Sequence, residues 1–488
     1  MFIKKIKYNY RQILINIFLI FNFAILFTSF FFIKYAIKEF ILFAIISIAY
    51  FYYSCLKFRY YAELYLSFFI YLGFYFKSTF YLIFNNNLNR DRLFPESAPF
   101  SKLATDEFLH QHLSEVFNIS SISIVTIFLT FYICNNLISY SDKKNNERNL
   151  ETIKKLFSNY KLKLYLIFSL ITVSLITLNF FFTVVTRGLK HDEFSIAGSI
   201  FKTFLFFGFY LVICIFLELE KTKKNINWII FFNIIMGFFN SISIYSRAMI
   251  IDQLVIYFSA TYKIKNLFYK TILLLLIIFF SLSSIFFVNS FRAQKWKVIQ
   301  KQTQTQTQIL SENEQAFNIN EQKFKDFFFI SEFRSLFVKR WVGIDGLSNV
   351  VSYKEKNLNF YLTALKEQKK SGITFYERIF FSKTTESELY SSSSLPGFIA
   401  FSYYSGSIFI LIITLILLVI TMVNIERIIN YFSMNLTIVK NYLVFLVVWR
   451  IIHFGAYPIN TVYYFLLIIF LVFCFFVFNR SLDKYYDK

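Results

Sequence analysis

The chain is poor in the residues that build metal centres and disulfide frameworks. Among its 488 residues there are four cysteines and four histidines. Cys55, Cys134, Cys214 and Cys474 all lie within or at the ends of apolar runs, so their placement predicts neither a disulfide framework nor a metal cluster. The scarcity of histidine also disfavours a zinc hydrolase.

Motifs that bind phosphate or carry a nucleophile are absent as well. The sequence has no glycine-rich phosphate loop, no Gly-x-Ser-x-Gly elbow and no Asp-rich segment suited to magnesium. We therefore expect no metal and no cofactor. An enzyme with this sequence would act by neutralising phosphate charge and by general acid–base catalysis.

Long apolar runs are what the chain has in abundance. Hydrophobic residues make up 57% of the sequence, the mean hydropathy is +0.52, and runs of about twenty residues recur along the chain. Each run is long enough to cross roughly 30 Å of hydrocarbon as a helix. The predicted fold class is an all-α polytopic membrane protein. Its net charge of +22 is then explained by topology, and no nucleic-acid partner is expected.

Twelve transmembrane helices are predicted. The first follows a basic N-terminal stretch and is too long for the core of a signal peptide, so we interpret it as a span. The predicted ranges are 12–33, 39–56, 62–84, 116–138, 164–186, 198–219, 227–245, 248–262, 271–290, 397–424, 441–457 and 460–478.

The distribution of Lys and Arg predicts the orientation. With a cytoplasmic N-terminus, the short inside segments hold about three times as many basic residues as the short outside loops. Both termini are then cytoplasmic. The predicted parts are spans one to nine in 1–290, a large extracytoplasmic loop in 291–396 and the last three spans in 397–488.

The large loop has internal organisation of its own. It opens with the low-complexity run Gln300–Gln308, for which we predict a flexible excursion. Apolar residues at helical spacing between Glu321 and Val351 predict an amphipathic helix at the outer membrane surface or capping the spans. A second helix is predicted near Leu358–Lys370. No internal repeat is evident, which disfavours an inverted-repeat transporter.

Five ionisable residues fall inside predicted spans, all of them in the outer half of the bilayer: Lys77, Lys202, Asp252, Arg450 and His453. Such groups are costly in hydrocarbon and are functional candidates by default. The two lysines are alternatively explained by snorkelling to the surface, and the aspartate by neutralising a neighbouring lysine. The other two share a helix face at a depth that favours a buried role.

Further charges lie in the loops on the same predicted side. Arg187, His191 and Asp192 belong to a short outer loop, Arg247 caps a turn between spans, and Arg292 follows the ninth span. The pattern indicates a cation-rich cavity that opens outward and would suit a lipid pyrophosphate. Contact with ordinary lipid phosphates is the alternative for the arginines.

Two segments and one spacing carry a resemblance to a known family. RWVGIDGLSNVVSY (Arg340–Tyr353) and LPGFIAFSYYSGS (Leu395–Ser407) look similar to stretches of polysaccharide polymerases, and ten residues separate Arg187 from Gly198. With the predicted topology, the chain resembles the bacterial O-antigen polymerase (Wzy) family and the related O-antigen ligases. A second Arg–Gly spacing expected in the large loop is absent. The histidine-containing version associated with ligases is also absent, which favours polymerase.

The resemblance implies glycosyl transfer at the outer face of the bacterial inner membrane, in the biosynthesis of a lipopolysaccharide-type glycan. The donor would be a growing glycan on undecaprenyl pyrophosphate and the acceptor a lipid-linked repeat unit. A chain-length regulator and a flippase would be partners, besides membrane lipid. The residues expected to bind the pyrophosphate are Arg187, Arg247, Arg292, Arg340, Lys202, Arg450 and His453. The candidate bases are His191, Asp192 and Asp252.

The competing class is a transporter, such as a lipid-linked oligosaccharide flippase. Twelve spans and an interior cationic cavity fit that class too. It predicts, however, that charge reaches the inner half of the spans and that no large outer loop is present. An assembly protein without catalytic activity is a third alternative.

Overall fold

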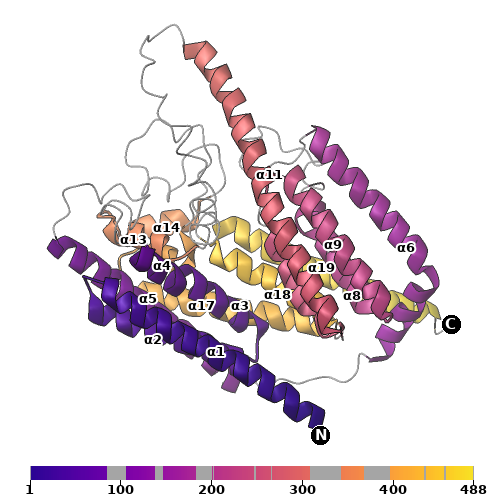
Figure 1. Ribbon diagram of the computed structural model, residues 1–488, viewed down its shortest axis with the longest axis horizontal. Coiled ribbons are helices and arrows are strands. Elements are labelled where there is room, and N and C mark those ends of the chain that lie inside the picture. The colour runs from indigo at the N-terminus through magenta and orange to yellow at the C-terminus, as the bar shows by residue number, and fades with distance from the viewer. Residues whose placement is uncertain are drawn as a thin grey trace. The chain divides into compact units, whose positions relative to one another are not determined.

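The structure is a computed structural model, and all of its regular elements are helical (Figure 1). The described part of the chain comprises residues 2–84, 106–137, 147–182, 201, 203–246, 249–264, 266–307, 342–367, 396–433, 436–454 and 458–486.

Most helices follow the apolar runs, and two of them contain a π-helical stretch, labelled η. In chain order the elements are α1 Phe2–Phe32, α2 Ile37–Lys57, α3 Tyr61–Ile70, η1 Tyr71–Phe76, α4 Lys77–Phe84, α5 Asp106–Leu137, α6 Glu147–Phe182, η5 Phe204–Gly208, α8 Phe209–Leu219, α9 Lys223–Ser243, α10 Met249–Ala260, α11 Leu267–Thr307, α13 Ile344–Ser352, α14 Leu358–Leu365, α16 Gly397–Ser402, α17 Ile408–Phe432, α18 Thr437–Ile452 and α19 Pro458–Tyr486.

The helical membrane character predicted from the sequence is confirmed at a coarse level. Six helices in the described part of the chain are long and apolar enough to cross a membrane: those at 37–57, 110–136, 153–182, 223–243, 267–288 and 408–432. Four shorter apolar helices lie at 16–32, 204–219, 250–260 and 458–474. Each of the twelve predicted ranges contains helix among its described residues, but twelve spans and the orientation stay predictions.

Two predicted boundaries are wrong. The run from Gln300 onward, expected to be flexible, continues α11 as helix through Thr307, because Gln and Lys are good helix formers and the run contains neither Gly nor Pro. The predicted span 397–424 is two elements: the short helix α16 ends at Ser402, and α17 begins only at Ile408. Gly406, with φ of +71°, lies in the turn between them.

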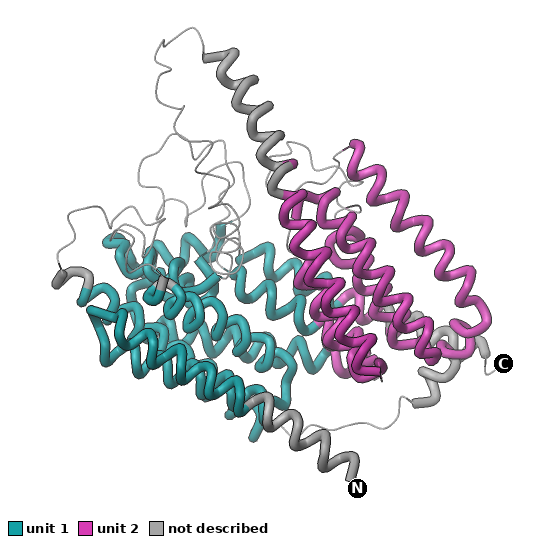
Figure 2. The backbone as a smooth tube through the Cα atoms, viewed as in Figure 1, with its two compact units in different colours: residues 1–141, 323–428, 444–469 teal, residues 142–322, 429–443, 470–488 magenta. Residues whose placement is uncertain are grey.

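The chain packs into two compact units, and neither is a continuous stretch of sequence (Figure 2). Unit 1 comprises residues 1–141, 323–428 and 444–469, and unit 2 comprises 142–322, 429–443 and 470–488. These units cut across the linear division into 1–290, 291–396 and 397–488. Of the predicted loop 291–396, residues 291–307 continue α11 in unit 2, whereas 342–367 and 396 belong to unit 1 together with the N-terminal helices.

In unit 1, a buried carboxylate caps one helix. The Oε1 and Oε2 atoms of Glu426, on α17, accept hydrogen bonds of 2.9 Å from the backbone N–H groups of Tyr61 and Ala62. These are donors of the first turn of α3, which no intrahelical acceptor satisfies. Arg427 donates through Nη2 to the hydroxyl of Tyr60 at 2.8 Å. The polar residues at this end of α17 thus have a structural role.

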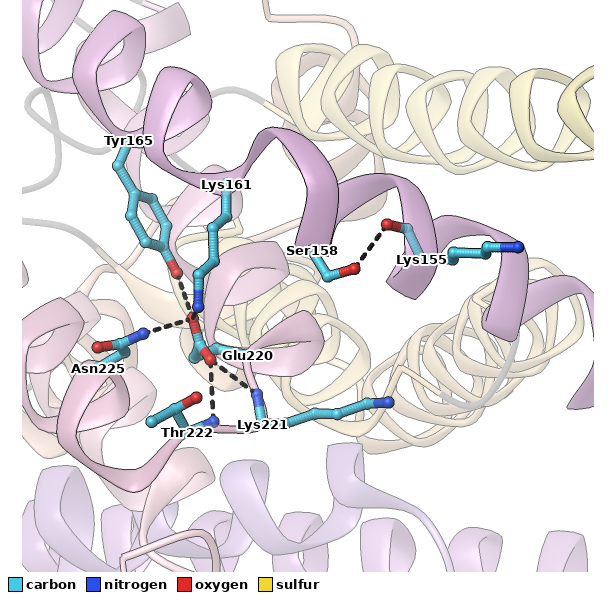
Figure 3. A network of polar contacts seen from close by, with 8 residues as sticks. All are labelled: Lys155, Ser158, Lys161, Tyr165, Glu220, Lys221, Thr222 and Asn225. Carbon is cyan, nitrogen blue, oxygen red and sulfur yellow. Dashed lines mark hydrogen bonds and ion pairs between the residues drawn. The ribbon is translucent and has the colours of Figure 1, made fainter.

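In unit 2, Glu220 ties the end of α8 to the start of α9 (Figure 3). Its carboxylate accepts from the Thr222 backbone N–H at 2.9 Å, the Tyr165 hydroxyl at 2.9 Å and the Asn225 amide at 3.1 Å. The Nζ atom of Lys161 lies 3.9 Å from Oε2 of Glu220. Burial by itself would raise the pKa of this carboxyl, but the hydrogen bonds outweigh burial and the pKa is lowered. Glu220 therefore stays ionised near neutral pH as a helix cap.

Candidate functional site

The large loop returns to unit 1 through the short helix α13. Seven of its nine residues are buried: Ile344, Gly346, Leu347, Ser348, Asn349, Val350 and Val351. The helix packs against α5 and α16, and it lies near α4 and α14 in Figure 1. The sequence predicted an amphipathic helix between Glu321 and Val351, and most of that segment lies outside the described residues, so the predicted helix stays a prediction. α13, at the end of the segment, is enclosed within the packing of the unit.

A close approach of two glycines allows α13 to begin where it does. Gly73 lies in η1, and Gly343 directly precedes α13. A Cβ atom on Gly343 would lie 2.1 Å from the carbonyl oxygen of Gly73, which no real contact permits. Only glycine leaves room for the two backbones to meet at this distance. The Gly73 backbone that Gly343 contacts belongs to the π-helical turn η1. Such turns are frequent at functional sites.

The two segments that carry the family resemblance meet in this part of unit 1. Gly397 of the second segment has φ of +79°, and a Cβ atom there would lie 2.6 Å from Cγ1 of Val342 in the first. The ring of Phe401 lies edge-on to that of Phe454, with centroids 5.2 Å apart. The short helix α16 therefore joins α13 to the end of α18.

Lys77 forms an ion pair with Asp345 at the start of α13. Its side chain is only 2% exposed, and that of Asp345 is 29% exposed. The snorkelling expected as one explanation for Lys77 is wrong, because its ammonium is buried and paired. Since an isolated charge in such a place is costly, the pair fixes α13 to the first residue of α4.

A second polar contact fastens α13 to α5. A ring nitrogen of His112 lies 2.9 Å from the hydroxyl of Ser348, and these two residues are 5% and 0% exposed. The geometry is that of a base beside a hydroxyl. With both groups buried, the contact holds α5 and α13 together.

The next turn of α5 carries a carboxylate that is accessible. Glu115 is half-buried, and its Oε1 accepts a hydrogen bond of 2.9 Å from the hydroxyl of Tyr403. Lys356 lies over the ring of Tyr403, 5.2 Å from its centroid, and donates to the carbonyl of Val351. Burial lowers the pKa of Lys356, and the charge of Glu115 partly offsets that effect. The three residues come from three segments far apart in sequence.

Glu115 and Tyr403 border an open groove of about 590 Å³. Further lining residues of α5 and α17 are His110, Gln111, Ser114, Asn118, Ile119, Ile122 and Ile408. In the described part of the chain, this lining offers a carboxylate, an imidazole, amides and hydroxyls but no Lys or Arg. The groove thus combines hydrogen-bonding groups with a single negative charge.

The predicted pair Arg450 and His453 also belongs to unit 1. Arg450, for which depth in the span predicted a buried position, is exposed, and its guanidinium lies 4.0 Å from the ring centroid of Tyr464. His453 is half-buried, with Nδ1 2.7 Å from the carbonyl of Trp449. Both residues keep their i, i+3 relation, but Arg450 lies on an outer surface of the helices.

Asp252, one of the three candidate bases, lies in α10 of unit 2. It is 7% exposed, and its Oδ1 accepts a hydrogen bond of 3.2 Å from the hydroxyl of Tyr442. Tyr442 itself is fully buried. The alternative role for Asp252, neutralising a neighbouring lysine, stays a prediction, because Lys202 lies outside the described residues. Asp252 is a buried hydrogen-bonded carboxylate.

The remaining predicted site residues cannot be placed. Arg292 lies in α11, and only its backbone is described. The others lie outside the described residues: Arg187, His191, Asp192, Lys202, Arg247 and Arg340. Whether the predicted cationic cavity forms around them stays a prediction.

Sequence reasoning missed Glu115, His112 and Lys356, and it gave Asp345 and Tyr403 no role. Asp345 and Tyr403 lie inside the two segments that resemble polymerases, so the resemblance pointed to the segments that contain them. The signal for Glu115 was the spacing of polar residues at the start of the fourth span, because Gln111, Ser114, Glu115 and Asn118 share one helix face.

Comparison with known proteins adds no family to these observations. No family model, no curated protein and no solved structure matches the chain.

Proposed function

We propose that this protein is a metal-independent membrane glycosyltransferase of the O-antigen polymerase type. It transfers a growing glycan from undecaprenyl pyrophosphate to a lipid-linked repeat unit at the outer face of the cytoplasmic membrane. The arginines Arg187, Arg247, Arg292 and Arg340 would neutralise the pyrophosphate as the anomeric bond breaks. Asp252, His191 or Asp192 would take the proton from the acceptor hydroxyl.

One observation carries the proposal more than any other: the large polar loop enters the helical packing of unit 1. α13 brings Asp345 to Lys77, and it lies beside the turn of α5 that holds Glu115. A loop that merely connects two spans needs no buried helix and no charged contacts. Such an inserted loop is what a site for a polar substrate at a membrane surface requires, and both segments that resemble polymerases contribute to it.

A flippase would need polar groups along a path through the spans. Glu63 and Glu426 are fully buried near the far end of α5, where Glu63 accepts from the Asn135 amide at 3.3 Å. That point is about 35 Å along the helix from His112. Glu426, however, is used as the cap of α3. Between these two points the buried polar side chains of α5 are the hydroxyls of Ser120, Ser121, Ser123 and Thr130, each bonded to a backbone carbonyl of the same helix. The described residues thus support a site at one end of unit 1 better than a charged path through the spans.

The proposal is tested by the length of the surface glycan in a deletion strain and in Arg187→Ala and Arg247→Ala variants. We expect long glycan chains to disappear while the lipid core capped with one repeat unit persists. The reason is that the arginines are needed only for joining repeat units. Gel electrophoresis of the extracted glycolipid resolves the two products.

Lys38→Ala is the matched control, because Lys38 is an exposed cation on the same predicted side of the membrane. It should leave the banding pattern unchanged. Full-length chains in both arginine variants would show that the cationic site is wrongly placed. Loss of the single-repeat product as well as the long chains in the deletion strain would indicate a flippase.

A further inference from the structure

The polar half of the groove is a row of side chains on one face of α5. Gln111, Ser114, Glu115 and Asn118 follow one another at three- and four-residue spacing and cover about 10 Å of helix. Each offers a carboxylate, amide or hydroxyl group. Such groups can accept hydrogen bonds, and the amides and hydroxyls can also donate them. Vicinal hydroxyls of a sugar match this mixture of donors and acceptors.

The charge of the groove argues against an anion. Among the described residues that line it, Glu115 is the charged one, and none is Lys or Arg. The ammonium of Lys356 is held by the carbonyl of Val351 and by the ring of Tyr403. A phosphate or pyrophosphate would meet the carboxylate of Glu115 at short range and be repelled, and the nearby ammonium of Lys356 only partly offsets this repulsion. The groove is therefore distinct in chemistry from the cation-rich site expected for the pyrophosphate.

The carboxylate is fixed in orientation. Tyr403 is 6% exposed, and its hydroxyl donates to Oε1 of Glu115. That bond leaves further acceptor capacity on the carboxylate, since each oxygen has two lone-pair sites. Ile119, Ile122 and Ile408 line the other half of the groove. They provide an apolar surface for the C–H face of a pyranose ring.

We propose that this groove binds uncharged sugar residues of a lipid-linked oligosaccharide, with Glu115 and its neighbours on α5 holding the sugar hydroxyls. The inference rests on the proposed function, to which it adds a subsite for the saccharide away from the pyrophosphate. It also predicts selectivity, because a uronic acid or a phosphorylated sugar in the groove would be repelled by Glu115.

The test uses a photo-crosslinking side chain, benzoylphenylalanine, in place of Ser114 in the full-length protein. The strain's own lipid-linked repeat units serve as ligand, and mass spectrometry of digested protein identifies the adducts. We expect sugar-bearing adducts at this position. The same probe in place of Leu129 is the control, because Leu129 is 48% exposed and lies about 22 Å further along α5. It should capture membrane lipid without sugar.

Glu115→Gln in the Ser114 probe protein should lower the yield of sugar-bearing adducts about tenfold, since hydrogen bonds to a charged group are the stronger ones. Glu115→Asp, which keeps the charge, should retain part of the yield and shows that the helix is intact. Only phospholipid adducts at position 114, or an unchanged yield in Glu115→Gln, would overturn the inference. The saccharide subsite and the polymerase function can fail separately. If the probe protein forms sugar-bearing adducts but the deletion strain still makes long glycan, the polymerase function alone is refuted.

Discussion

At the scale of single residues, the ion pair of Lys77 with Asp345 decides how the large loop meets the spans. Lys77 is nearly inaccessible and Asp345 is partly exposed, so the pair is desolvated on one side. Removal of one partner from such a pair costs more than removal of both, because the remaining charge is left in a poorly solvated place. The pair therefore fixes the position of α13 relative to α4.

We predict that Asp345→Asn lowers the free energy of unfolding by about 2 to 3 kcal/mol, the lower part of the range for a broken buried pair because Asp345 is partly exposed. The double variant Lys77→Met with Asp345→Leu should recover most of this loss. Thermal unfolding of the purified protein in detergent measures both effects. Equal stability of the single variant and the wild type would mean that the pair does not hold α13.

At the scale of elements, the sequence was sufficient to predict almost every helix but not the burial of α13. Apolar runs of about twenty residues have one explanation in a membrane protein, and each of the twelve predicted ranges contains helix among its described residues, although 397–424 is interrupted between Ser402 and Ile408. The segment from Glu321 to Val351 has an amphipathic pattern, which specifies a helix with one apolar face. That pattern does not say which surface covers the face; for α13, the described end of the segment, α5 and α16 cover it.

The glycines at the start of α13 belong to the same scale, since they set how closely two elements approach. A methyl group on Gly343 would collide with the Gly73 backbone, so Gly343→Ala should displace α13 and lower the free energy of unfolding by about 1 to 3 kcal/mol. Long glycan should be lost with it. Gly208→Ala is the control, because its nearest new contact would be an ordinary 3.4 Å. Equal effects of the two substitutions would contradict this account.

At the scale of the whole molecule, the sequence was least informative about the site. The predicted site combined residues from loops on one side of the membrane. The distribution of Lys and Arg between the loops can predict that these loops share a side. The accessible polar cluster of unit 1 depends on contacts between segments nearly 300 positions apart, such as that of Glu115 with Tyr403. No periodicity in a single sequence encodes such a contact. Only the resemblance of the segment around Tyr403 to polymerases pointed toward it.

The topology is the prediction on which the proposed chemistry depends most. If the site uses lipid carriers of the outer leaflet, the segment 291–396 must lie outside and the loop 139–163 inside. Alkaline phosphatase fused after Leu310 should be active, because the enzyme matures only outside the cytoplasm, and the same enzyme fused after Asp142 should be inactive. A fluorescent protein fused after Lys488 should fluoresce, which reports a cytoplasmic C-terminus. The reverse pattern would place the α13 contacts and the Glu115 groove at the cytoplasmic face, where neither the proposed polymerase nor its saccharide subsite could act on outer-leaflet substrates.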